Sequence, residues 1–260
     1  MHENDRIGKL AEEIRLAFGL LGRLPVGTGR PSAGETVAAS AWAWPLVGGV
    51  LAALAGAAGL LATALNLPAP LAAAVALSTL MLLTGALHED GLADTADGLW
   101  GGATPERRLE IMKDSRIGTY GMLALLLVVL LRWSALAALA GAGGGALPAA
   151  MVVAGAVSRA LMAAAMAGLA NARSTGLSAL AGRPRSRTAL HALALALALA
   201  LLLSGAAGLI AFLLAALAAL AVAALANARI GGQTGDILGA IQQVGETVVL
   251  VGLTAAWATG

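Results

Sequence analysis

Four carboxylates and a histidine are gathered in the segment from His88 to Gly98, directly after an apolar stretch long enough to cross a bilayer. The carboxylates are those of Glu89, Asp90, Asp94 and Asp97. Carboxylate oxygens suit the hard cation Mg²⁺, and Mg²⁺ held by aspartate commonly serves phosphate chemistry. The segment therefore predicts a magnesium site at the edge of a membrane.

The three aspartates have a spacing that fits one face of a helix. If residues 90–98 are helical, Asp90, Asp94 and Asp97 lie within an arc of about 60°, because each residue turns the helix by roughly 100°. Three like charges on one face repel one another unless a cation lies among them. A solvated helix end is the alternative, and it would be the better interpretation of a single aspartate. For three aligned aspartates we favour a metal site.

The neighbours of these aspartates are expected to play lesser parts. Glu89 lies off the aspartate face and is expected to be solvated. His88 also points away from that face, so it can contribute only from a helix end or a bend. Gly91 and Gly98 flank the aspartates and leave room for a bulky ligand, although they weaken the helix.

A second polar segment follows at residues 104–121. Thr104 and Pro105 form an N-cap and a first-turn proline, which predict a short helix through about Lys113. Asp114 is a candidate for a further metal ligand. Lys113 and Arg116 could bind phosphate oxygens.

A third polar element opens the last apolar segment at residues 231–236. One helical face here combines polar and small residues, namely Asp236, Gly239, Gln243 and Glu246. Glu246 lies about 15 Å deeper than Asp236 at 1.5 Å per residue, and a carboxylate at that depth is costly unless it is paired or functional. Arg132 and Arg159 are the available intramembrane partners. A structural Arg–Glu pair and a role in substrate binding both remain open.

The composition is that of a membrane protein with several spans. Of the 260 residues, 59% are hydrophobic and 12% are charged, and the mean hydropathy is +0.86. Soluble domains are roughly half apolar and about one quarter charged. A span needs about 20 apolar residues. Seven segments qualify: Val37–Leu65, Ala69–Leu87, Thr119–Ala140, Leu147–Ala170, Thr188–Leu203, Gly208–Ala226 and Ile237–Ala258.

The loops between these segments alternate between two classes. Loops 66–68, 141–146 and 204–207 have no charged residue, whereas the N-terminal segment and the other loops carry nearly all the Lys and Arg residues. By the positive-inside rule, the N-terminus and the charged loops lie in the cytoplasm. The net charge of +2 is therefore mainly a topology signal. Nucleic-acid binding is the weaker alternative, because no basic platform is interleaved with aromatic residues.

We expect an all-α bundle of about seven transmembrane helices that forms one integral-membrane domain over residues 1–260. Residues 1–36 form a cytoplasmic or interfacial segment, in which the apolar spacing over 3–21 predicts an amphipathic helix on the membrane surface. Residues 88–118 form a cytoplasmic acidic catalytic region. We expect no cleavable signal peptide, and the absence of Cys excludes disulfides.

Several of these motifs together resemble the cobalamin synthase family, which comprises adenosylcobinamide-GDP ribazoletransferases. The resemblance covers nearly the whole chain. Its most specific parts are HEDGLADTADG at 88–98, RLEIMKDSRIGTYG at 108–121 and TGDILGA at 234–240 with Glu246, and it extends to RLPV at 23–26 and PLVGG at 45–49. Glu89 departs from the family, in which Leu is common at this position.

The resemblance implies a reaction that joins adenosylcobinamide-GDP to α-ribazole, or to its 5′-phosphate, with release of GMP. Mg²⁺ held by Asp90, Asp94 and Asp97 would neutralise charge on the pyrophosphate, and one of these or His88 would orient or deprotonate the attacking hydroxyl. The remaining assignments are Lys113 and Arg116 to the GMP phosphate, Asp236 to a second ion or the ribose, and Arg159 and Arg173 to phosphate or propionamide groups.

The resemblance also implies a multi-pass protein of the bacterial cytoplasmic (inner) membrane, with its active site facing the cytoplasm. Other late cobalamin-pathway enzymes are possible partners, and the bundle could form an oligomer. Two other functions compete with this one. A CDP-alcohol phosphotransferase expects Arg where Asp94 stands and a different later spacing. A divalent-cation transporter usually binds its ion near the midplane rather than at one membrane face.

Overall fold

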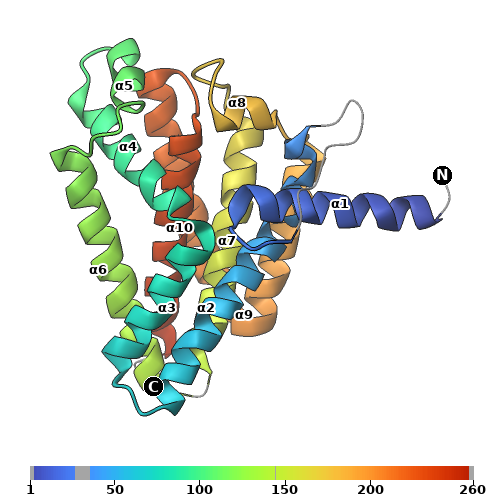
Figure 1. Cartoon of the computed structure of the whole chain (residues 1–260), viewed down its shortest axis with the longest axis vertical. Helices are drawn as coiled ribbons and strands as arrows, with labels where there is room; N and C mark the ends of the chain where they lie inside the picture. Colours follow the sequence, from blue (N-terminus) through green and yellow to red (C-terminus); the bar gives the residue numbers. More distant parts are fainter. Residues whose placement is uncertain (1–2, 27–35, 144, 258–260) are drawn as a thin grey trace.

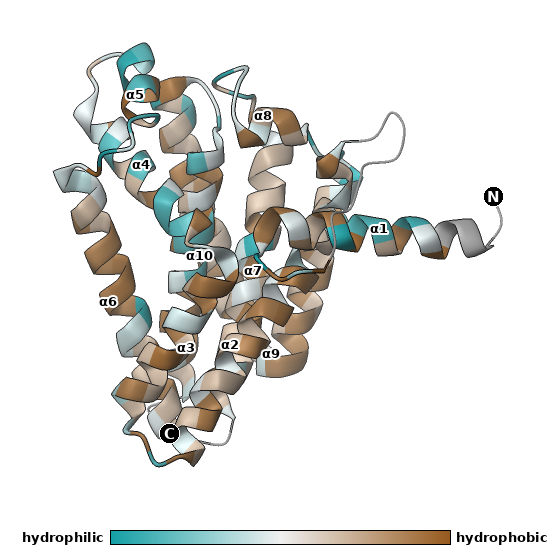
Figure 2. Ribbon diagram, in the orientation of Figure 1, coloured by the Kyte–Doolittle hydropathy of each residue, from teal (hydrophilic) through white to brown (hydrophobic). Residues whose placement is uncertain are grey.

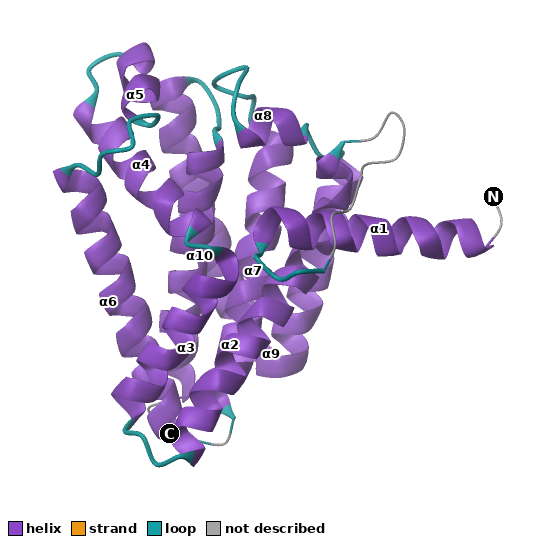
Figure 3. Cartoon of the chain, in the orientation of Figure 1, coloured by secondary structure: helices purple, strands orange, loops and turns teal. Residues whose placement is uncertain are grey.

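The computed structural model describes residues 3–26, 36–143 and 145–257, and within these ranges the protein is built from helices without a β-strand (Figure 3). Arg30 and Ala258, which belong to the predicted N-terminal segment and the predicted seventh span, lie outside the described residues. The helices are α1 (Glu3–Leu21), the 3₁₀ helix η1 (Val37–Ala43), α2 (Trp44–Ala64), α3 (Ala69–Thr84), α4 (Leu87–Gly101), α5 (Pro105–Ile111), α6 (Thr119–Ala142), α7 (Ala146–Gly168), α8 (Leu177–Ala181), α9 (Ser186–Ile230) and α10 (Gly235–Trp257).

The helix lengths and apolar composition confirm a polytopic bundle. Five helices are long and apolar enough to cross a membrane, namely α2, α6, α7, α9 and α10, and the bent pair α3–α4 would be a sixth. Hydrophilic residues gather around α4, α5 and the nearby loops, while α6 and much of α3 are hydrophobic (Figure 2). The hydrophilic residues are therefore concentrated at one end of the bundle.

Helix α9 is a hairpin with two arms. Its 45 residues would extend about 67 Å as one straight helix, more than twice the thickness of a hydrocarbon core. The chain reverses at Gly205, whose φ of 53° and ψ of −133° are not helical. A side chain at Gly208 would collide with the Ala200 carbonyl, which lies two turns earlier in sequence, so the arms run back alongside each other. The arms correspond to the predicted segments Thr188–Leu203 and Gly208–Ala226.

The second predicted span ends earlier than expected. Helix α3 stops at Thr84 rather than continuing to Leu87, because Gly85 and Ala86 both adopt left-handed backbone angles, with φ of 65° and 55°. Left-handed residues commonly end a helix. The axis of helix α4 is bent by 87° from that of α3, and the bend lies just before His88. This bend was not predicted from the sequence, although Gly85 marks its position.

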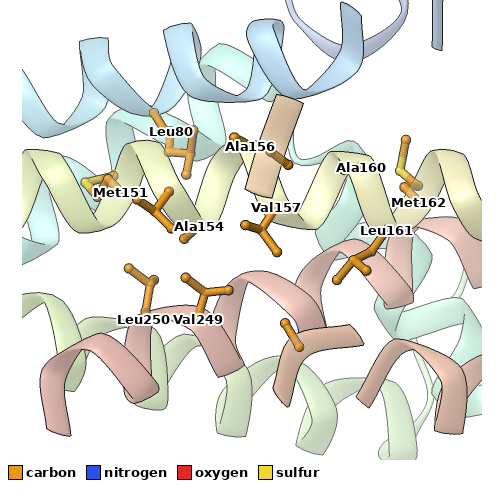
Figure 4. Close-up of a cluster of buried hydrophobic side chains, with 14 of the residues drawn as sticks. Leu80, Met151, Ala154, Ala156, Val157, Ala160, Leu161, Met162, Val249 and Leu250 are labelled. Carbon is orange, nitrogen blue, oxygen red and sulfur yellow. The ribbon is translucent and has the colours of Figure 1, made fainter. Parts of the chain in front are cut away.

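Helix α7 forms the centre of the bundle and packs against α2, α9 and α10. Gly48 of α2 and Gly155 of α7 bring two backbones together, because a Cβ added at Gly155 would lie only 2.5 Å from the Gly48 carbonyl oxygen. Such close approach of small residues is a common basis for helix association in lipid. Leu80, Val249 and Leu250 complete the packing around α7 (Figure 4).

Helix α1 projects sideways from the bundle, while its last turns pack against the core (Figure 1). Ala17 and Leu21 are fully or almost fully buried, whereas Ile7 and Leu10 are 62% and 47% exposed. The exposed apolar residues fit the predicted helix on the membrane surface.

Helix α6 begins at a side chain of α4. The Asp97 carboxylate accepts hydrogen bonds from the backbone N–H groups of Gly118 at 2.7 Å and Gly121 at 2.9 Å. These N–H groups belong to the first turn of α6, where no earlier carbonyl can satisfy them. The negative charge also complements the positive end of the helix dipole. Asp97 therefore caps α6 and fastens it to α4.

Gly155→Leu should destabilise the bundle, because the added side chain has to displace the α2 backbone. Overpacking of this kind typically costs about 1–3 kcal/mol. We expect a lower thermal midpoint in detergent than for the wild type. Gly168→Leu is the matched control on the same helix, since nothing lies within 4 Å of a Cβ at Gly168. Equal midpoints for the two variants would contradict the close α2–α7 contact.

Asp97→Ala should also lower the thermal midpoint, because two N–H groups of α6 lose their acceptor at a cost of about 1–3 kcal/mol. Asp97→Asn keeps one acceptor oxygen and should fall between Asp97→Ala and the wild type. Asp90→Ala, which removes an exposed aspartate from the same helix, serves as the control and should leave the midpoint unchanged. The capping role is wrong if Asp97→Ala is as stable as Asp90→Ala.

Candidate active site

Six helices meet at a pocket beside the N-terminal end of α10, which we call the α4–α10 pocket. Its volume is about 120 Å³. The polar residues that line it are His88, Asp90, Arg173, Ser178 and Asp236. The apolar part of the lining, which we call the apolar wall, includes Leu21, Trp44, Met162, Met166 and Leu238. Four of the predicted site residues, His88, Asp90, Arg173 and Asp236, are thus brought together from three separate parts of the chain.

The pocket exists because α4 and α10 cross at two glycines. A Cβ added at Gly91 would lie 3.0 Å from the Asp236 carbonyl oxygen, and one added at Gly239 would lie 3.3 Å from the Gly91 Cα. Gly91 also lines the pocket whereas Gly98 does not, so the prediction that these glycines leave room for a ligand fails at Gly98 only. Gly91 packs against α10, and Gly98 packs against Met112 and Arg108 beside α5. Both glycines serve helix packing.

Asp236 is held at the start of α10 by two partners. Its Oδ2 accepts hydrogen bonds from Arg173 at 3.0 Å and from the Thr234 hydroxyl at 3.1 Å. The same Thr234 hydroxyl accepts a bond from the N–H of Ile237 at 3.3 Å and so caps the helix. The Asp236–Arg173 pair fixes a carboxylate and a guanidinium in the pocket wall.

Two loops that are about sixty residues apart in sequence are joined around Gln233. Its backbone N–H donates to the Ala170 carbonyl at 2.8 Å, and its carbonyl accepts from the N–H of Ala172 at 2.9 Å. Its side chain accepts a bond from Ser178 at 2.7 Å and donates to Asn171. This junction positions Arg173 opposite Asp236. Gln233, Asn171 and Ser178 were not predicted as site residues, because their pairing spans distant loops and leaves no local pattern in the sequence.

Asp90 and Asp94 present carboxylates that are not engaged in structural bonds among the described residues. Asp90 is exposed and Asp94 is half-buried. Asp90, Asp236 and Asp97 are close enough to Asp94 for their charges to repel its carboxylate, while Arg173 partly offsets this repulsion. Such a concentration of negative charge favours a bound cation.

The predicted set of three aspartates requires correction at Asp97. The helix over 90–98 is confirmed, but the Asp97 oxygens face α6, where both accept N–H groups. Over the described ranges, no three His, Asp or Glu side chains converge in an arrangement that could hold a metal ion. Asp97 is therefore a structural cap in this structure rather than one member of a preformed triad.

A buried polar network lies deeper in the bundle, around Glu246. Its carboxylate pairs with Arg132 of α6 and Arg159 of α7, as the sequence analysis anticipated, and accepts a bond from Gln242 at 2.6 Å. Arg132 also donates to Glu89 at 3.0 Å and to Gln243 at 2.7 Å. Two arginines and two glutamates thus neutralise one another in a region where single charges would be costly.

Glu89 is not solvated as predicted. It is 7% exposed and pairs with Arg132, because the 87° bend before α4 turns this side of the helix towards the bundle interior. The structure gives Glu246 and Arg159 structural partners. It does not place them in the lining of the α4–α10 pocket. Their assignment to substrate remains a prediction.

His88 lies between this network and the pocket. It is only 2% exposed, and neither ring nitrogen has a hydrogen-bond partner among the described residues. Arg159, Glu246 and Arg132 all act on it electrostatically. A buried imidazole without partners is unfavourable unless a ligand completes it.

The residues of the second polar segment lie on an exposed loop after α5. Asp114 and Arg116 pair at 2.6 Å, and the hydrogen bonds from Arg116 lower the pKa of the Asp114 carboxyl to about 2. Lys113 is exposed, and Arg116 is 87% exposed. None of the three lines the α4–α10 pocket. Asp114 is thus engaged by Arg116 and separate from Asp90 and Asp236.

The carboxylates in and beside the pocket nevertheless suit Mg²⁺. This cation is usually held by one or two carboxylates together with substrate phosphates and water, rather than by a complete protein cage. Asp90 and Asp94 offer free carboxylate oxygens, and the uncommitted Oδ1 of Asp236 lies in the same region. The residues therefore suit a magnesium ion that binds together with a phosphorylated substrate.

Comparisons with known proteins identify the family of the chain. A model of the family described as cobalamin-5-phosphate synthase matches residues 13–254. A relative from Bradyrhizobium diazoefficiens, named adenosylcobinamide-GDP ribazoletransferase, is 48% identical over 98% of both chains. Relatives of the same name from Brucella ovis and Brucella canis are 43% identical over 96% of this chain and 99% of their own. No solved structure matches the chain. This protein therefore belongs to the cobalamin-5-phosphate synthase family.

Proposed function

We propose that this enzyme is an adenosylcobinamide-GDP ribazoletransferase, as its relatives are named. It joins adenosylcobinamide-GDP to α-ribazole or to α-ribazole 5′-phosphate and releases GMP. The observation that carries the proposal is the pocket itself, where Asp90, Asp236, Arg173 and His88 converge in a chain that matches its relatives over nearly its full length. The alternatives, a CDP-alcohol phosphotransferase and a cation transporter, are not favoured by these matches.

The reaction replaces a phosphoanhydride bond with a phosphate ester bond. A ribose hydroxyl oxygen attacks the phosphorus that carries the cobinamide, the bond from this phosphorus to the bridging oxygen breaks, and GMP departs with that oxygen. The hydroxyl proton must leave during the attack, and a carboxylate of Asp90 or Asp94 can accept it. Arg173, fixed by Asp236 at 3.0 Å, supplies positive charge beside the reacting phosphate.

Magnesium is part of this proposal, with Asp90 and Asp94 as its ligands and Asp236 near enough to contribute. When bound, the ion would neutralise charge on the pyrophosphate oxygens and on the departing GMP. Asp97 supports the site indirectly, because it fixes the helix on which Asp90 and Asp94 stand. Asp114 remains a candidate only if its pair with Arg116 opens on substrate binding.

The pocket end of the bundle is proposed to face the cytoplasm of a bacterial inner membrane. The basic loops support this orientation by the positive-inside rule. Arg107, Arg108, Lys113 and Arg116 all lie in the region after α4, at the same end as the pocket.

Asp94→Asn should lower the rate of GMP release by at least about 100-fold, because the site loses a charged ligand and a possible proton acceptor. The assay supplies adenosylcobinamide-GDP and α-ribazole to the purified protein in detergent and measures GMP. Chelation should abolish activity and added Mg²⁺ should restore it. Glu106→Gln on exposed α5 is the control and should retain activity. Near-normal, chelator-resistant turnover by Asp94→Asn would refute the magnesium assignment.

Arg116→Ala should raise the KM for adenosylcobinamide-GDP about tenfold, as expected for loss of one charged phosphate contact of about 1.4 kcal/mol. The KM for α-ribazole should stay the same, because the GMP moiety belongs to the other substrate. Arg107→Ala is a matched control, since Arg107 is also exposed and pairs with a carboxylate, that of Glu110. Equal KM values for the Arg116→Ala and Arg107→Ala variants would remove Arg116 from the substrate site.

A further inference from the structure

We propose that the apolar wall of the α4–α10 pocket receives the benzimidazole base of the ribazole, and that His88 donates a hydrogen bond to the base's free ring nitrogen. This inference rests on the proposed function and names the substrate part that occupies the pocket. It makes His88 a residue that determines base specificity, whereas the carboxylates carry the chemistry.

The apolar wall is preformed and buried. Trp44 is 1% exposed and Met166 is 2% exposed, while Met162 and Leu238 are also buried. Met162 and Met166 are four residues apart on α7 and therefore lie on the same helical face. The Trp44 indole N–H is already satisfied by Ser40 at 3.3 Å, so the ring offers the pocket an apolar surface. Methionine side chains adapt to flat aromatic groups and contact them favourably.

Beside this wall, His88 has unsatisfied hydrogen-bonding groups. It is almost fully buried, it lines the pocket, and both its ring nitrogens lack partners among the described residues. A neutral imidazole carries one N–H donor and one acceptor nitrogen. A ligand with a single acceptor in an otherwise apolar ring would satisfy the donor without introducing new unpaired groups.

The fragments of the two substrates differ in how well they meet these requirements. Guanine and adenine carry several donors and acceptors, which an apolar wall would leave unsatisfied. The corrin ring is far too large for a pocket of about 120 Å³. A benzimidazole is flat and apolar and has one free ring nitrogen once the other bears the ribose. It therefore matches the apolar wall beside His88, whereas Arg173 Nη1, the other atom of a lining side chain without a partner among the described residues, is left for a phosphate oxygen.

This placement also directs the ribose. Asp90 and Asp236 line the same pocket as His88, and Asp90 is exposed at its rim. With the base against Trp44 and Met166, the ribose extends towards these carboxylates. The attacking hydroxyl thereby reaches the groups that activate it, and binding the base sets the geometry of the reaction.

The first test changes the size of the apolar wall and measures kcat/KM for ribosides of a small base, imidazole, and of the natural benzimidazole. Met166→Ala enlarges the pocket and removes a contact with the base, so kcat/KM for the benzimidazole riboside should fall about tenfold. Met166→Phe should shift preference towards the imidazole riboside by about tenfold. Met151→Ala and Met151→Phe are controls, since Met151 is equally buried on α7 but does not line this pocket. The proposal fails if the preference stays the same in both Met166 variants.

The second test removes the proposed hydrogen bond in two ways, by changing the base of the substrate and by changing His88. An indole riboside has the shape of the benzimidazole riboside but lacks the free ring nitrogen, so the wild type should use it at least about tenfold less well. His88→Phe should remove this discrimination and leave the KM for adenosylcobinamide-GDP unchanged. If His88→Phe discriminates as the wild type does, or if the KM for adenosylcobinamide-GDP changes instead, the base lies elsewhere. Absence of GMP release by the wild type would instead refute the proposed function.

Discussion

The cost of placing charge inside a bilayer is the constraint on which this structure depends. Glu246, Glu89, Arg132 and Arg159 come from four different helices, and each would be strongly unfavourable alone. Their pairing fixes α4, α6, α7 and α10 relative to one another, because removing any member leaves an uncompensated charge. His88 lines the pocket and lies next to this network, so the pocket carboxylates Asp90 and Asp236 are carried by helices whose relative positions the network fixes.

Close helix packing at small residues adds to the ion pairs in fixing the positions of the helices. Gly48 and Gly155 let α2 approach α7, and Gly91 and Gly239 let α4 cross α10. In lipid, such close contacts substitute for the hydrophobic effect that packs soluble proteins. The same crossing that brings α4 and α10 together places Asp90 beside Asp236. The contact that packs the two helices therefore also assembles the carboxylates of the pocket.

The sequence predicted much of this arrangement. The apolar segments, the helix that carries the aspartates, the partners of Glu246 and the family were all accessible from residue types and spacing. The errors share one physical origin, which is that helical spacing gives the relative directions of side chains but not what they face. Asp97 lies on the aspartate face, yet it meets the end of α6. Glu89 lies off that face, yet it meets Arg132 because of a bend at Gly85 and Ala86. Contacts between distant segments, such as that of Gln233 with Ser178, leave no periodic trace.

The Asp97 cap has a mechanical consequence. Helix α6 exposes a long row of leucines, including Leu123, Leu127 and Leu130. Only about one fifth of the residues in its apolar stretch are buried within the protein. Its tilt is therefore sensitive to the thickness and lateral pressure of the surrounding lipid. Its first turn is fastened through Asp97 to α4, the helix that also carries Asp90 and Asp94, so α4 and α6 are constrained to move together. The cap thus connects a lipid-facing helix directly to the helix that carries the acidic groups of the pocket.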